Sequence, residues 1–215
     1  MQNPAKRPQT AKEEILNAWT HGFGLLLGIM GIPLLISKAW YLDDVKNLLG
    51  AFAFSLGIVM VYGFSTAYHA AKNPKKKAKL QIMDHVSIYF LIAGSYTPMV
   101  LAILKTEDAV LFLSIIWASV LIGTFFKLFF TGKFKTLSVV IYLTMGWLAV
   151  FFYKDLVDRL SLEILVWIGL GGLSYTLGVI FYVQSNRPYF HAIWHVFVLG
   201  GTAAHFVAVY QLQLL

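Results

Sequence analysis

The sequence predicts an all-α polytopic membrane protein, a bundle of seven transmembrane helices. Hydrophobic residues make up 59% of the 215 positions and charged residues only 13%, whereas soluble globular proteins have about 45–50% and about 25%. Seven apolar stretches are each long enough to cross a bilayer core, which takes about 17–25 helical residues. Basic residues gather in alternate connections between these stretches, as expected of a chain that crosses a membrane repeatedly.

The seven stretches follow one another with connections of only a few residues. The first exceeds the roughly 7–15-residue core of a secretory signal, so we expect it to stay in the mature protein. Because the connections leave no room for another unit, we expect a single domain over 1–215 with a short cytoplasmic segment of about 1–14. The expected spans are 15–37, 48–71, 82–104, 109–130, 136–153, 161–183 and 189–212.

The charges of the connections predict the orientation. One side of the membrane receives twelve lysines and arginines, and the other receives five. The first group is Lys6, Arg7, Lys12, Lys72, Lys75, Lys76, Lys77, Lys79, Lys127, Lys133, Lys135 and Arg187, and the second is Lys38, Lys46, Lys105, Lys154 and Arg159. The positive-inside rule puts the N-terminus in the cytoplasm and the C-terminus outside. The net charge of +7 suits anionic lipid head groups; no nucleic-acid partner is expected, because the lysines lie in short loops beside the spans.

Five polar residues are expected at one depth near the cytoplasmic boundary. His191 and His195 are four residues apart at the start of the seventh span, so they share one helix face. Ser65 and His69 have the same spacing at the inner end of the second span, and Asp84 comes in the first turn of the third. Helix rise places all five about 5–10 Å below the boundary.

The residue types predict a zinc site. An ionisable side chain costs up to about 2.5–3.5 kcal/mol at mid-membrane, so four at one level require a common partner. Without cysteine, a metal must be held by His, carboxylate or water. Three imidazoles and one water match catalytic zinc, with Asp84 orienting a ligand or the water and Ser65 hydrogen-bonding nearby. Alternatively, these are unrelated polar residues that bridge helices.

Other polar residues are expected to serve mainly the fold. We expect His21 to be a hydrogen-bonded packing residue, or else to support the metal or contact substrate. His85 points about 100° away from Asp84 and is expected at an interface, and His205 is expected to form a structural hydrogen bond. Lys127 is expected to extend to the head groups. No chain of titratable groups crosses the bilayer, which argues against a proton-coupled transporter.

Hydroxyls are stacked above the expected metal on the same helix faces. Tyr62 lies above His69, Ser95 above Asp84, and Thr202 above the two histidines of the last span. They would line a mostly apolar cavity suited to a lipid chain. The alternative is ordinary helix packing, to which Ser and Thr contribute in membranes.

Five stretches of the sequence carry a family resemblance: 14–22 (EILNAWTHG), 65–69 (STAYH), 84–98 (DHVSIYFLIAGSYTP), 145–147 (MGW) and 191–205. They resemble the hemolysin III family, the bacterial branch of the progestin and adipoQ receptor superfamily, which includes adiponectin receptors and is distantly similar to alkaline ceramidases. The resemblance implies seven helices, a cytoplasmic N-terminus and zinc bound by His69, His191 and His195, with Asp84 and Ser65 acting through water or behind the ligands.

The leading functional hypothesis is a zinc-dependent hydrolase of lipid amides or esters in the inner (plasma) membrane, with a role in lipid homeostasis. Zinc lowers the pKa of bound water to about 7, Asp84 would take the proton, and Ser65 would assist at the oxyanion. A membrane lipid or fatty-acyl compound would be the substrate. One alternative is a lipid-responsive regulator with structural zinc. A cytolysin is disfavoured, because seven apolar spans with short loops offer no polar pore-lining stripe.

Overall fold

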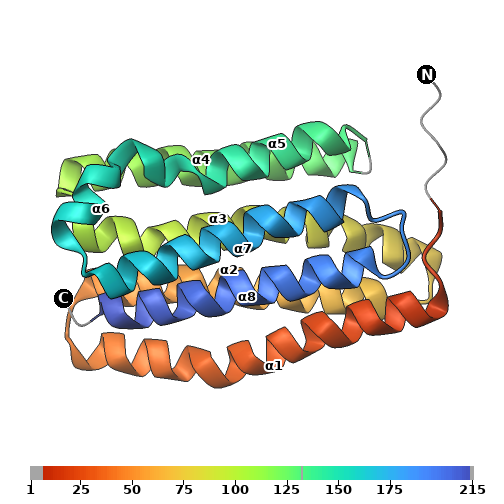
Figure 1. Ribbon diagram of the computed structural model, residues 1–215, viewed down its shortest axis with the longest axis horizontal. Coiled ribbons are helices and arrows are strands. Elements are labelled where there is room, and N and C mark those ends of the chain that lie inside the picture. The colour runs from red at the N-terminus through yellow and green to blue at the C-terminus, as the bar shows by residue number, and fades with distance from the viewer. Residues whose placement is uncertain (1–6, 132, 214–215) are drawn as a thin grey trace.

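The computed structural model describes residues 7–131 and 133–213, and within these ranges the chain is helical (Figure 1). Seven of its helical spans are long and apolar enough to cross a membrane, which confirms the predicted fold class. Residues 1–6 of the expected N-terminal segment lie outside the described residues. The elements are α1 (Ala11–Tyr41), α2 (Val45–Ala70), α3 (Pro74–Ile103), α4 (Thr106–Phe130), α5 (Lys135–Gly146), the 3₁₀ helix η1 (Leu148–Phe152), α6 (Tyr153–Arg159), α7 (Leu162–Val183) and α8 (Phe190–Leu212).

The long helices run roughly along one axis, with α1 at one edge of the bundle and α4 with α5 at the opposite edge (Figure 1). Helix α3 is the most buried span and packs against α2, α4 and α8. Helix α1 contacts α2 and α8, which in turn pack against α3 and α7. The elements that carry the predicted site, α2, α3 and α8, are therefore neighbours, and α1 covers two of them.

Helix α3 begins earlier than predicted. Its N-cap is Asn73, whose side chain accepts a hydrogen bond from the Lys76 amide at 3.1 Å, and Pro74 occupies the first turn, where its missing N–H costs nothing. Asp84 therefore lies in the third turn of α3, and the prediction that it lies in the first turn is wrong. The additional turns carry four lysines, so they extend the helix beyond its apolar part.

The fifth span is broken. It was expected over 136–153, but α5 ends at Gly146 and the chain continues through η1 and α6 to Arg159. The Tyr96 hydroxyl, from α3, donates to the Gly146 carbonyl at 2.7 Å and accepts from the Ala149 amide at 3.0 Å. Backbone groups released by a break inside a membrane need such partners. The charged residues from 154 to 159, expected in a loop, lie on α6.

Candidate metal centre

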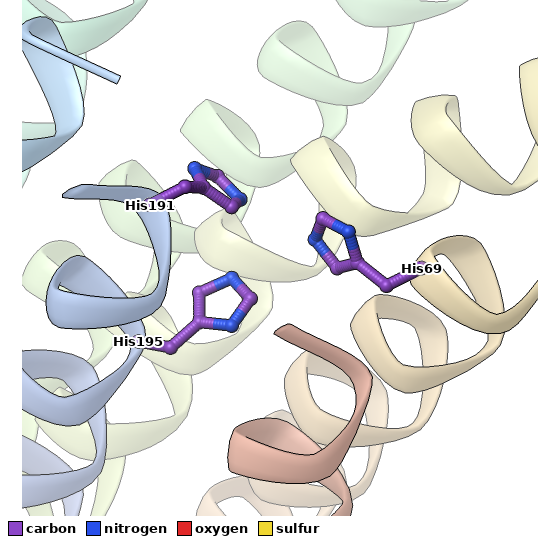
Figure 2. A group of neighbouring side chains, drawn as sticks. All are labelled: His69, His191 and His195. Carbon is purple, nitrogen blue, oxygen red and sulfur yellow. The ribbon is translucent and has the colours of Figure 1, made fainter. Parts of the chain in front are cut away.

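Three histidines converge from two helices (Figure 2). His69 comes from the last turn of α2, and His191 and His195 come from the first two turns of α8. One ring nitrogen from each lies within 4.8 Å of the others. The ring centroids of His69 lie 5.1 Å from those of both other histidines, which are 4.6 Å from each other. The chain thus brings the three expected ligands together at one end of the bundle.

A carboxylate from α1 holds the His69 ring. Its Nδ1 lies 2.7 Å from Glu14 Oε2, and the other oxygen of Glu14 lies 3.0 Å from Lys77 Nζ. A carboxylate can only accept, so the proton belongs on Nδ1 and the lone pair on Nε2. That Nε2 is buried and has no hydrogen-bond partner among the described residues. Carboxylate–histidine pairs of this kind orient metal ligands, so His69 fits a metal.

The His195 ring is also held through its Nδ1 atom, in this case by a backbone carbonyl and a hydroxyl of α1. Its Nδ1 lies 3.2 Å from the Asn17 carbonyl and 3.1 Å from Thr20 Oγ1. Because the carbonyl only accepts, Nδ1 carries the proton and Nε2 is the nitrogen available to a metal. The His21 ring stacks on His195 with centroids 3.5 Å apart and meets Tyr62 edge-on at 5.1 Å.

A clamp between the N-terminal segment and the α7–α8 connection sets the start of α8. Tyr189 has a left-handed backbone, with φ 64°, and its amide donates to the buried Glu13 carboxylate at 2.9 Å. Glu13 also accepts from Arg7 at 2.6 Å, and Arg7 Nε donates to the Asn186 carbonyl at 3.2 Å. His191 follows two residues after Tyr189, so this clamp positions its helical turn.

Helix α1 therefore contributes to the surroundings of each histidine. Sequence reasoning named His21 of this helix as an alternative support of the metal, but it missed Glu13, Glu14 and Thr20. The available signal was a polar stripe inside an otherwise apolar span: Glu13, Glu14, Asn17, Thr20 and His21 recur at helical spacing. His21 was expected to be a hydrogen-bonded packing residue. It does pack, but neither ring nitrogen has a hydrogen-bond partner within the described part of the chain, so the hydrogen-bond part of that prediction is wrong.

Asp84 and Ser65 lie around the histidines without joining them as ligands. Among the described residues, the group of side chains close enough to share one metal ion consists of the three histidines and includes no carboxylate. Asp84 interacts electrostatically with Tyr68 and Tyr182, whose rings lie 4.6 Å from His69 and 6.3 Å from His191, respectively. Ser65, one turn before His69, is buried, and its hydroxyl has no hydrogen-bond partner among residues 7–131 and 133–213.

The space predicted to be a cavity is bridged by side chains. The Tyr62 hydroxyl donates to Thr202 Oγ1 at 2.8 Å, and the Tyr175 hydroxyl lies 2.9 Å from the same atom. Ser95 donates back to Ile92 of its own helix at 2.9 Å. Tyr62 and Thr202 are buried. For Tyr62 and Thr202 the alternative, polar packing between helices, describes the observed contacts, whereas the bond of Ser95 stays within α3.

Three remaining polar residues have clear partners. His205 Nε2 donates to the Ile168 carbonyl at 3.3 Å, which confirms its structural role. His85 Nδ1 donates to the Gln81 carbonyl at 2.6 Å, within its own helix. Lys127 was expected to extend to the head groups, but it is buried, and the prediction is wrong because its ammonium bonds inward to Ser138.

Comparison with known proteins identifies the family. The model described as "Haemolysin-III related" matches residues 9–206. "Hemolysin-3 homolog" of Bacillus subtilis (strain 168) is 42% identical over 200 residues, covering 93% of this chain and 94% of the relative. "Hemolysin-3" of Bacillus cereus is 38% identical, with coverages of 94% and 92%. "Monocyte to macrophage differentiation factor" of Homo sapiens is 30% identical, with coverages of 94% and 85%. The chain thus belongs to the hemolysin III family of multi-pass membrane proteins, as its histidine motifs predicted.

Proposed function

We propose that the chain is a zinc-dependent hydrolase that cleaves an amide or ester bond of a lipid in the inner (plasma) membrane and so contributes to lipid homeostasis. The observation that carries this is the convergence of His69, His191 and His195, with the Nδ1 atoms of the first and last fixed by Glu14 and Asn17. Three imidazoles leave a fourth position for water, as in catalytic zinc sites.

Each nearby residue has a role in this proposal. When bound, zinc would lower the pKa of water to about 7 and polarise the scissile carbonyl. Asp84, which is half-buried beside Tyr68 and Tyr182, would accept the proton of the attacking water. Ser65, whose hydroxyl has no partner among the described residues, would donate a hydrogen bond to the oxygen that gains charge. The lipid would enter from the bilayer and water from the cytoplasm.

Two measurements test the proposal. Metal analysis of purified protein should give one zinc per chain, with a loss in His69→Ala, His191→Ala and His195→Ala and none in His85→Ala, a neighbouring control. Mass spectrometry of a lipid extract incubated with the protein should show a consumed lipid pool, and Asp84→Ala should abolish that turnover while zinc stays bound. Undiminished zinc in all three histidine variants would overturn the metal centre. If no lipid is consumed, the hydrolase assignment fails.

A second candidate is a lipid-responsive membrane regulator in which zinc ties α2 to α8. The hydrogen bonds that join Tyr62, Thr202 and Tyr175 favour it, because they connect hydroxyls that were expected to line a substrate cavity. Metal that binds only the folded state stabilises that state. A regulator should therefore lose thermal stability on chelation and consume no lipid, whereas the hydrolase should lose turnover as well. Equal stability with and without zinc would exclude the regulator.

A further inference from the structure

A buried lysine links α4 to α5 on the opposite side of α3 from α1. Lys127 is only 2% exposed and lies one turn before the end of α4. Its Nζ donates to Ser138 Oγ at 2.6 Å, and that hydroxyl donates to the Phe134 carbonyl at 3.2 Å. Among the described residues, no carboxylate oxygen lies within 4.0 Å of this ammonium. The cation is therefore buried without a counter-charge.

The surroundings of Lys127 include a second unused donor. Its Nζ lies 5.7 Å from the centroid of the Tyr142 ring, which meets the Tyr89 ring edge-on at 4.8 Å. Tyr89 packs against Gly123, one turn before Lys127 on α4: a Cβ at that glycine would lie 2.5 Å from Tyr89 Cζ. The Tyr142 hydroxyl is bonded to the His85 carbonyl at 3.0 Å, whereas the Tyr89 hydroxyl is buried with no partner in the described part of the chain.

An ammonium without a carboxylate partner and a phenol without a hydrogen-bond acceptor, as found among the described residues, are suited to an oxyanion. Burying an unpaired charge is costly, and charge-assisted hydrogen bonds to a carboxylate or phosphate are strong. The α4–α5 connection adds exposed Lys133 and Lys135 at the same end, which would attract anionic head groups. Three phenylalanine rings in contact offer an apolar surface for an acyl chain: the Phe126 and Phe130 centroids are 5.1 Å apart, and those of Phe130 and Phe134 are 5.9 Å apart.

We propose that Lys127, whose ammonium is held in place by Ser138, and Tyr89 bind the oxyanion of an acyl-chain amphiphile. Two membrane compounds carry this chemistry: an anionic phospholipid, through its phosphate, and a fatty acid, through its carboxylate. The site involves none of the three histidines, so it stands independently of the metal centre and of the hydrolase proposal.

The test compares thermal unfolding of the full-length protein in nanodiscs of phosphatidylcholine alone and with added phosphatidylglycerol or oleate. Wild type should show a higher Tm with at least one anionic amphiphile. Lys127→Met, which keeps the length of the side chain and removes its charge, should lose this rise. Lys105→Met, at the exposed opposite end of α4, should keep it.

The two anionic additions distinguish the ligands. A Lys127-dependent rise with phosphatidylglycerol alone assigns the site to phospholipid, and a rise with oleate alone assigns it to fatty acid. The proposal is overturned if neither raises the Tm of wild type, or if Lys127→Met keeps the full rise. Should Lys127→Met not fold, Tyr89→Phe replaces it in the same measurement, and an unchanged rise there overturns the proposal equally.

Discussion

Glu14 is the residue through which α1 acts most directly on the proposed metal centre. Its carboxylate joins His69 of α2, at 2.7 Å, to Lys77 of α3, at 3.0 Å. Glu14→Gln removes the charge and keeps the size, so the carboxylate that fixes the tautomer of His69 is replaced by a neutral amide, whose oxygen is a weaker acceptor and whose NH₂ group can turn toward the ring instead. We expect zinc affinity to fall about 10–100-fold, the usual effect of removing such a partner, as measured by competition with a chelator of known affinity.

A matched control comes from Glu107, which is exposed in the first turn of α4 at the other end of the bundle. Glu107→Gln should bind zinc like wild type. If Glu14→Gln also binds zinc as tightly as wild type, the carboxylate does not orient His69, and the contribution of α1 to the centre is structural only.

At the residue scale, the sequence indicates the three candidate metal ligands but not the residues that orient them. Spacings of four residues and the expected depth were enough to group His69, His191 and His195, because helix periodicity is a local property. The contacts of Glu14 and Asn17 depend on which helix packs beside α2 and α8, and spacing within α1 carries no such information. The same holds for Lys127: its inward bond depends on Ser138 of another helix.

At the scale of elements, the seven spans follow from length and hydropathy, whereas two of their details do not. Helix α3 starts at Pro74 because Asn73 caps it and Pro fits its first turn, although its lysine-rich beginning is too polar to count as a span. The break after Gly146 depends on the Tyr96 hydroxyl from α3. That partner is about fifty positions away in sequence, so local pattern cannot predict the break.

Close packing of α2 on α3 gives a prediction at this scale. A Cβ on Gly57 would lie 2.8 Å from Leu91 Cα and 2.9 Å from the Phe90 carbonyl oxygen. Because these are backbone atoms of α3, the added methyl group can be accommodated only if the two helices shift apart. Gly57→Ala should therefore cost about 1–3 kcal/mol of unfolding free energy, as overpacking usually does. Reversible unfolding in mixed micelles, followed by circular dichroism, measures the cost.

Another glycine of the same helix serves as its control. A Cβ on Gly63 would meet no atom within 4 Å, so Gly63→Ala should be neutral or stabilise by up to about 1 kcal/mol through helix propensity. Equal stability of the two alanine variants would show that the α2–α3 contact tolerates an added methyl group.

At the scale of the whole molecule, the proposed centre lies at the end of the bundle where the N-terminal segment and the α2–α3 and α7–α8 connections meet. The clamp formed by Arg7 and Glu13 is at this end, as are the lysines at the start of α3. The positive-inside rule predicts that this end faces the cytoplasm. The orientation decides which compartment supplies water to the site and which leaflet supplies amphiphiles to Lys127.

The absence of cysteine from the sequence makes that orientation directly measurable. Lys75→Cys, exposed in the first turn of α3, and Glu107→Cys, exposed in the first turn of α4, lie at opposite ends of the bundle and introduce one thiol each. In intact cells, a membrane-impermeant maleimide should label Glu107→Cys and leave Lys75→Cys unmodified until the membrane is permeabilised, because the lysine-rich end is retained in the cytoplasm. The wild-type chain, without a thiol, gives the background. The reverse labelling pattern would place the histidines at the outer face, and hydrolytic water would then enter from outside the cell.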